Sequence, residues 1–172
     1  VVVHAHDVNG VPSVLEIQVK RSITFSPNDP VFHKVVDQIA EVSRRADFWT
    51  SNYELAIATA KTSQKIERAY QEVLTWARKL GDAATFMARI ARPGSANQDM
   101  RTFVHTFTSH LNEAGTPADD EMVWKLLCKL QIHVYDFTAQ GSVAEELVKE
   151  RAVRTLHTDD TIRAADLWAN LV

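Results

Sequence analysis

The sequence predicts an α/β fold: a small mixed β-sheet with an N-terminal hairpin, followed by a helical extension. Three observations predict it. Polar and apolar residues alternate over residues 15–20, which is the period of a β-strand. The dipeptide Asn9-Gly10 just before this stretch is a strong hairpin signal. A helix pattern and then another strand pattern follow, and the order strand, strand, helix, strand is typical of an α/β core.

The hairpin is predicted to cover residues 1–20, with Asn9 and Gly10 as a two-residue turn. In that register Val1 lies opposite Gln18. The chain begins within this strand pattern and has no initial methionine, so we expect it to be part of a longer protein.

The next helix is predicted to begin after Asp29, which can cap its first turn, with Pro30 at the first helical position. It is expected to end near Arg45, where a cation suits the helix C-terminus. The apolar, β-branched pattern of residues 53–59 then predicts a third strand.

The rest of the chain is predicted to be mainly helical. We expect residues 1–60 to form an α/β core lacking its N-terminal part, and residues 61–172 to pack on that core or follow it. The expected elements are helices at residues 61–80, 82–91, 95–115 and 117–130, a short strand at 132–137, and helices at 142–157 and 159–171.

Composition excludes several classes of protein. Hydrophobic residues make up 45% and charged residues 24% of the 172 residues, which excludes a disordered or collagen-like chain. A net charge of -3 gives no bulk attraction to nucleic acid, so any DNA contact must be local. The chain contains no apolar run long enough to span a bilayer, and its lone cysteine, Cys128, cannot form an internal disulfide. We therefore expect a cytoplasmic protein without membrane contact, in which Cys128 is a helix residue rather than a nucleophile.

The second hairpin strand carries the candidate chemistry. Side chains alternate along a strand, so Glu16, Gln18 and Lys20 are expected to share one face. Carboxylate and amide oxygens suit Mg²⁺, which predicts Glu16 and Gln18 as metal ligands. Lys20 is a cation that can position or activate a water beside a phosphate. The pattern therefore predicts metal-dependent hydrolysis of phosphodiester bonds, with all three residues as catalytic candidates.

The run Glu-Ile-Gln-Val-Lys at residues 16–20, followed by a helix and a strand, resembles the restriction-endonuclease-like, or PD-(D/E)xK, nucleases. It is most similar to the Mrr-like branch, in which Gln-x-Lys replaces acid-x-Lys. With residues 21–25 it also resembles N-terminal nuclease domains of large bacterial nucleotide-binding defence proteins. The resemblance covers about the first 60 residues. It implies a Mg²⁺-dependent endodeoxyribonuclease that acts in antiviral defence, with DNA as partner, and that forms a homo-oligomer through or with further domains of a larger chain.

The resemblance also implies a separate aspartate near the start of the first hairpin strand as the main metal ligand. Residues 1–3 contain no acid, so we expect that ligand to precede Val1. Asp7 is predicted to lie next to the turn, too far along the strand from Lys20 to share a metal. The following helix offers Asp37 and Gln38, which would reach the site if that helix packs across it.

Other interpretations of the same pattern stay open. In the first interpretation, the polar face of the strand is simply a solvated surface. In the second, the chain is a catalytically inactive, nuclease-like module for nucleic-acid binding or oligomerisation. In the third interpretation, the helical half of the chain is a scaffold inside a larger sensor protein.

Histidines and surface cations complete the candidate residues. His4 and His6 share one side of a strand, but two ligands do not complete a tetrahedral zinc site. His105 and His110 are predicted to be surface residues. The cations Lys61, Lys65 and Arg68 form a partly basic helix side that can contact phosphate, although a solvated face is the commoner role.

Overall fold

The structure, a computed structural model, describes residues 1–6, 10–61 and 63–135 of the chain. The chain divides into two compact units, Val1–Val134 and Tyr135–Val172, and the helices and strands of the described residues all belong to the first. The helices predicted at residues 142–157 and 159–171 lie outside the described residues. No helix among the described residues is both long enough and apolar enough to cross a membrane.

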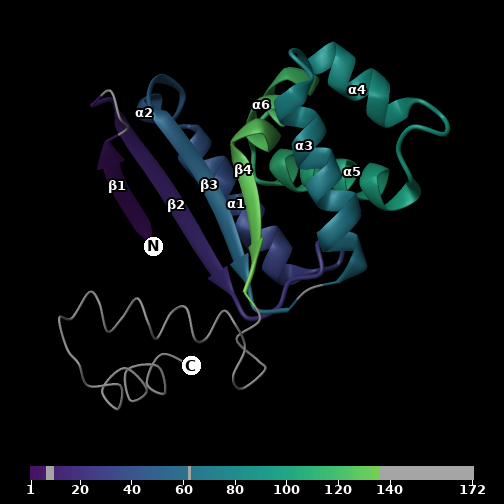
Figure 1. Cartoon of the computed structure of the whole chain (residues 1–172), viewed down its shortest axis with the longest axis horizontal. Coiled ribbons are helices and arrows are strands. Elements are labelled where there is room, and N and C mark those ends of the chain that lie inside the picture. Colours follow the sequence, from purple (N-terminus) through teal and green to yellow (C-terminus); the bar gives the residue numbers. More distant parts are fainter. Residues whose placement is uncertain (7–9, 62, 136–172) are drawn as a thin grey trace. The chain divides into compact units, whose positions relative to one another are not determined.

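Four strands form one mixed sheet in the order β1-β2-β3-β4, as Figure 1 shows. They span Val2–His6 (β1), Pro12–Lys20 (β2), Asn52–Thr59 (β3) and Leu130–Val134 (β4). The β1-β2 pair is antiparallel, whereas the β2-β3 and β3-β4 pairs are parallel. This confirms the predicted α/β fold with a mixed sheet and an N-terminal hairpin.

The predicted hairpin register is wrong by one residue. The last paired residues are His6 and Pro12, so the connection is longer than two residues. Val1 lies opposite Ile17 rather than Gln18, and the Ile17 amide donates to the Val1 carbonyl at 2.7 Å. A one-residue shift exchanges the two faces of a strand. The observed register sets Val1 opposite Ile17 and Val3 opposite Leu15, and the longer connection replaces the tight Asn-Gly turn.

Helix α1 spans Pro30–Ser43 and begins as predicted, with Asp29 as its N-cap. One carboxylate oxygen of Asp29 accepts the amide of Val31 at 2.9 Å. The other accepts both the amide and the hydroxyl of Thr24, at 2.6 and 2.8 Å. Asp29 therefore fastens the loop after β2 to the start of α1.

Replacing Asp29 with alanine is expected to lower the free energy of unfolding by about 1–3 kcal/mol at pH 7. Burial raises the pKa of Asp29, but the hydrogen bonds from Thr24, Val31 and Phe32 outweigh it, and the pKa is lowered. A depressed folded-state pKa gives stability that is present above the unfolded pKa and lost as pH falls through the folded pKa. The difference between wild type and Asp29→Ala should therefore shrink below about pH 4, which urea unfolding at pH 7 and pH 3 measures.

The matched control is Asp82, which caps helix α4 from an exposed position and accepts hydrogen bonds within the first turn of that helix, chiefly from Thr85. Asp82→Ala should cost less stability than Asp29→Ala. Equal losses would show that the Thr24 contacts add nothing to ordinary capping.

The predicted helix at residues 61–80 is divided into two parts. Residues Lys65–Tyr70 form a π-helix, η1, and Gln71–Lys79 continue as α3. A short helix, α2 (Ala46–Thr50), precedes β3 and was not predicted. Five residues are too few to show a helical period, which is why the pattern missed it.

The remaining predicted helices are confirmed within a few residues as α4 (Ala83–Ala91), α5 (Gln98–Glu113) and α6 (Asp120–Lys129). Each begins with a capping side chain that accepts a backbone amide of the first turn. These caps are Asp82, Asn97 and Asp119.

Four aromatic rings meet in the core: Phe25, Phe32, Tyr70 and Phe103. They come from the loop after β2, from α1, from η1 and from α5, and all are buried. Phe25 has a φ of 57°, a left-handed backbone conformation that costs a non-glycine residue about 1–2 kcal/mol. The rings therefore join helices on both sides of residue 61 into one core.

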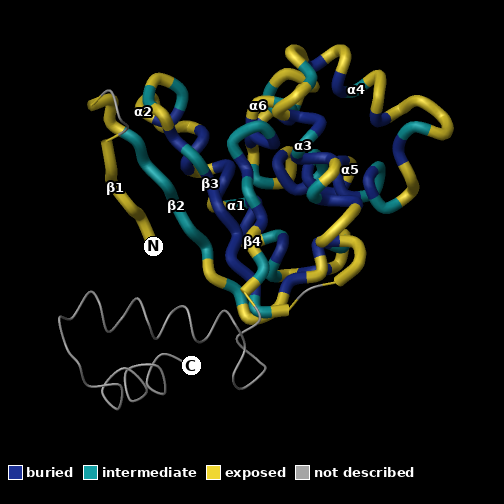
Figure 2. The backbone as a smooth tube through the Cα atoms, in the orientation of Figure 1, coloured by how far each residue is buried: buried dark blue, intermediate teal, exposed yellow. Residues whose placement is uncertain are grey.

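Burial of the sheet increases from β1, which is exposed, through β2 to β3, which is almost wholly buried (Figure 2). The fully buried face of β3 carries Tyr53, Leu55 and Ile57. This gradient places β2, with the candidate residues, between the core and the solvent.

Helix α6 is tied to the end of α3 by side-chain hydrogen bonds. The carbonyl of Ala77 accepts from Trp124 Nε1 at 2.9 Å and from Cys128 Sγ at 3.0 Å. Carbonyls in the last turn of a helix have no intrahelical donor, so these bonds satisfy one of them. Burial raises the pKa of the Cys128 thiol.

Candidate functional site

The candidate residues of β2 share the buried face of the sheet. In the β2-β3 register Glu16 lies beside Leu55, Gln18 beside Ile57 and Lys20 beside Thr59. Neighbouring residues of paired strands point to the same side, so the three polar side chains project on the face that the core covers. They are half-buried. The polar face of β2 is therefore a polar margin of the core and not a fully solvated surface.

Gln18 is the unusual member of the three. Its side-chain oxygen, Oε1, is buried and has no hydrogen-bond donor among the described residues. A buried acceptor without a partner costs about 1–3 kcal/mol. The amide oxygen is thus held where a donor or a cation would stabilise it.

Glu16 is engaged elsewhere. Its Oε2 accepts the hydroxyl of Tyr53 at 2.7 Å. Burial first, and then this bond to Glu16, raise the pKa of Tyr53 to about 12. Arg45 lies over the Tyr53 ring, 5.7 Å from its centroid, and pairs with Asp47 at 2.6 Å. Glu16 therefore belongs to a polar network at the start of β3.

Lys20 lies at the other end of β2, where the parallel strands β2 and β3 both reach their carboxyl ends. Its backbone carbonyl accepts the amide of Ala60 at 3.3 Å. Beyond these strand ends is an open cavity of about 490 Å³, whose rim includes Ser22, Lys61 and Lys65. Ligands of α/β proteins commonly bind at the carboxyl ends of parallel strands.

The cations near this cavity come from two segments. Lys65 pairs with Asp99 at 2.7 Å, and both residues also line a neighbouring cavity with the exposed Arg68. Lys61 is exposed at the first rim. Lys61 and Lys65 therefore line the cavity beyond the strand end that carries Lys20, Arg68 lines the neighbouring cavity, and the charge of Lys65 is balanced by Asp99.

The two residues expected to reach the site from α1 form no hydrogen bond or ion pair with β2 among the described residues. Gln38 is exposed. The Asp37 carboxylate instead pairs with His33 Nδ1 at 3.1 Å. His4 and His6 are both exposed on β1, and Asp7 lies outside the described residues.

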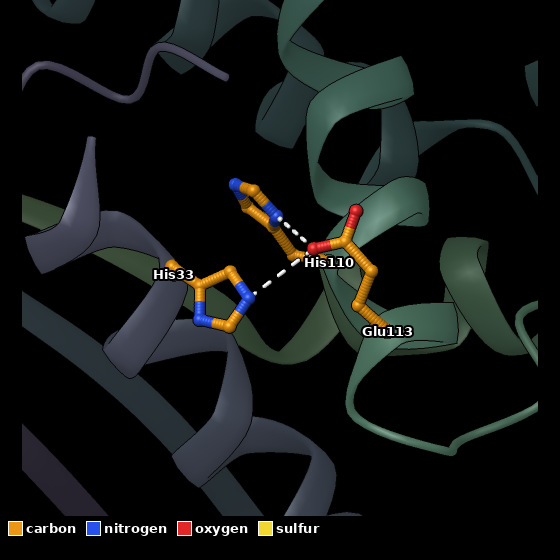
Figure 3. A group of neighbouring side chains, drawn as sticks. All are labelled: His33, His110 and Glu113. Atoms are coloured by element: carbon orange, nitrogen blue, oxygen red, sulfur yellow. Dashed lines mark hydrogen bonds and ion pairs between the residues drawn. The ribbon is translucent and has the colours of Figure 1, made fainter. Parts of the chain in front are cut away.

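The sequence did not indicate a second polar cluster, formed by His33 of α1 with His110 and Glu113 of α5 (Figure 3). Glu113 Oε2 lies 3.2 Å from His33 Nε2 and 3.2 Å from His110 Nδ1. Hydrogen bonds, from His110 first and then from Ser109, lower the pKa of Glu113. His110 is only 5% exposed, so its prediction as a surface residue is wrong, whereas His105 is exposed as predicted.

The only sequence signal for this cluster is the spacing of His110 and Glu113, three residues apart on one helix. Residues at that spacing lie on the same helix face. Their partner His33 comes from another helix, and no local pattern predicts that contact.

Comparisons with protein-family models, with curated proteins and with solved structures give no match to this chain.

Proposed function

We propose that this chain is a metal-dependent nuclease domain that hydrolyses DNA phosphodiester bonds. The observation that carries the proposal is the buried, unpartnered Oε1 of Gln18 on the same strand face as Lys20. An amide oxygen is a suitable ligand for a hard cation such as Mg²⁺. A cation at this oxygen would remove the cost of leaving it without a partner.

The two proposed metal ligands fit Mg²⁺ unequally. Gln18 offers a buried oxygen with no competing donor among the described residues. Glu16 fits less well because its Oε2 already accepts the Tyr53 hydroxyl. We therefore assign Gln18 to the metal and give Glu16 the role of tuning the charge of the site.

A bound Mg²⁺ supplies Lewis-acid polarisation of the phosphate and a more acidic water. The Lys20 ammonium, at the strand end, stabilises negative charge that develops on the phosphate. The cavity beyond this end is lined by Ser22 and Lys61 rather than by Gln18 or Lys20, and the proposal places the approaching nucleic acid there.

Local charge supports DNA as the partner. The chain has a net charge of -3, so bulk attraction to DNA is absent. Lys61, Lys65 and Arg68 nevertheless border the cavities near the end of β2. Side chains of this kind contact the phosphate backbone and set the position of the duplex without reading its sequence.

The resemblance of the Gln18 and Lys20 segment to defence nucleases supplies the biological context. We propose that the domain is the N-terminal effector of a larger bacterial anti-phage protein that acts in the cytoplasm as a homo-oligomer.

Cleavage of plasmid DNA by the native protein tests the function, with Mg²⁺ present or removed by chelation. Gln18→Ala is expected to reduce Mg²⁺-dependent cleavage about 10–100-fold and to leave the free energy of unfolding unchanged or higher, because it removes a buried oxygen without a partner. A purely structural amide would instead lose stability on substitution.

The matched control is Gln38→Ala, an exposed glutamine on α1, which should cleave like wild type. Full activity in Gln18→Ala would refute the assignment of Gln18. A native protein that binds DNA but never cleaves it would overturn the nuclease proposal and favour the inactive, nucleic-acid-binding module.

A further inference from the structure

The cluster of His33, His110 and Glu113 joins two helices at the edge of the core. His33 lies in the first turns of α1, whereas His110 and Glu113 lie in the last turn of α5. One ligand atom from each of the three residues lies within 4.8 Å of the other two. Figure 3 shows both imidazoles turned toward the same oxygen of Glu113.

Two of the three spacings among these atoms agree with those of a tetrahedral metal centre. Zinc binds histidine nitrogen and carboxylate oxygen at about 2.0–2.2 Å, so neighbouring ligand atoms of a tetrahedral site lie about 3.3 Å apart. Glu113 Oε2 is 3.2 Å from His33 Nε2 and 3.2 Å from His110 Nδ1. Two edges of the ligand triangle therefore already have the required length.

The ligands are oriented by further partners, as in metal sites. Asp37 Oδ2 lies 3.1 Å from His33 Nδ1. With a proton on Nδ1, this contact would leave the lone pair of Nε2 for a metal in place of its present contact with Glu113. The Ser109 hydroxyl donates to Glu113 Oε1 at 3.0 Å and fixes the carboxylate. A carboxylate behind a histidine is a common outer partner of zinc ligands.

The third ligand is oriented by packing. The His110 ring is buried and lies edge-on to Phe32, with ring centroids 5.6 Å apart. Its other nitrogen, Nε2, has no hydrogen-bond partner among the described residues. The ring thus presents Nδ1 to Glu113, and a bound metal would take the place of that hydrogen bond.

Solvent can reach the cluster from one side. The His33 and Glu113 side chains are 41% and 53% exposed, whereas the His110 side chain is 6% exposed. A metal ion can therefore reach the cluster from solvent.

We propose that His33, His110 and Glu113 bind one divalent transition-metal ion, Zn²⁺ foremost, with a water molecule as the fourth ligand. Two imidazoles and one carboxylate form the ligand set of open zinc sites. This site lies on α1 and α5 rather than on β2, so it goes beyond the nuclease proposal and does not depend on it. The bound ion would link the two helices.

Binding of Zn²⁺ and Co²⁺ to the chelator-stripped native protein tests the proposal without DNA. Calorimetry should show one tight equivalent of Zn²⁺, and Co²⁺ should give the intense visible absorption of a tetrahedral site. His33→Ala and Glu113→Ala replace exposed side chains, so both should fold, which circular dichroism checks. Each should weaken Zn²⁺ binding by more than about 100-fold, and Asp37→Ala by about 10–100-fold.

Two controls locate the site. His105→Ala removes an exposed histidine of the same helix and should leave Zn²⁺ affinity unchanged. The double variant His4→Ala/His6→Ala tests the exposed pair on β1 and should also bind normally. Absence of a tight equivalent, or its loss in the β1 double variant but not in His33→Ala, would overturn the proposal and leave a hydrogen-bonded cluster.

Discussion

Replacing Lys20 with alanine should abolish Mg²⁺-dependent DNA cleavage while leaving the fold intact. The ammonium is the cation that the proposed site holds nearest to the end of β2, and removing a group that stabilises developing charge costs roughly 10²- to 10³-fold in rate. Lys20 is half-buried at a strand end, so its loss creates no large cavity. Single-turnover cleavage measures the rate, and circular dichroism with urea unfolding checks the fold.

Lys61→Ala is the matched control, since Lys61 is an exposed lysine just beyond the end of the neighbouring strand β3. It should weaken DNA binding and reduce the salt dependence of affinity, with the cleavage rate at saturating DNA preserved. Unchanged cleavage by Lys20→Ala would refute the assigned role of Lys20. Equal losses of cleavage rate in the two variants would show that Lys20 is only one of several residues that contact the DNA phosphate backbone.

Replacing Phe25 with alanine should lower the free energy of unfolding by about 3–5 kcal/mol, a larger loss than that expected for Asp29→Ala. The Phe25 ring is fully buried. Its centroid lies 5.0 Å from that of Phe32, 5.3 Å from that of Tyr70 and 5.8 Å from that of Phe103. Truncation would leave a cavity at the point where three helices meet, and guanidinium unfolding monitored by fluorescence measures the cost.

Phe25→Gly separates the ring from the backbone. Both variants lose the ring, but the left-handed φ of 57° suits glycine, so Phe25→Gly should be more stable than Phe25→Ala by about 1–2 kcal/mol. If alanine proves as good as glycine, the backbone at residue 25 does not hold the left-handed conformation in solution. If the free energy of unfolding of Phe25→Ala lies within about 1 kcal/mol of that of wild type, the Phe25 ring is not a main contributor to the stability of the core.

The fold could be predicted because its signals are local. Alternation over residues 15–20 gives β2 directly, and Asp29 followed by Pro30 marks the start of α1. The hairpin register could not be predicted from Asn9-Gly10 alone. Both registers place apolar residues opposite one another, so the local sequence does not decide between a two-residue turn and the longer connection that forms.

The candidate sites depend on contacts that a sequence pattern does not contain. Alternation predicts that Gln18 and Lys20 share a strand face, but it cannot show that the Gln18 oxygen is buried without a partner among the described residues. It likewise cannot show that Glu16 turns to Tyr53, which lies 37 positions further along the chain. His33 and Glu113 are 80 positions apart, and helix packing alone brings them together.

The bond from Cys128 to the Ala77 carbonyl has a chemical consequence. A sulfur that donates its proton to a carbonyl stays in the thiol form, and burial raises its pKa further. Alkylating reagents and oxidants react with the thiolate form of cysteine. The chain's single sulfhydryl group should therefore resist both in the folded state. An increase in the rate at which Cys128 reacts would then indicate that α6 has separated from α3.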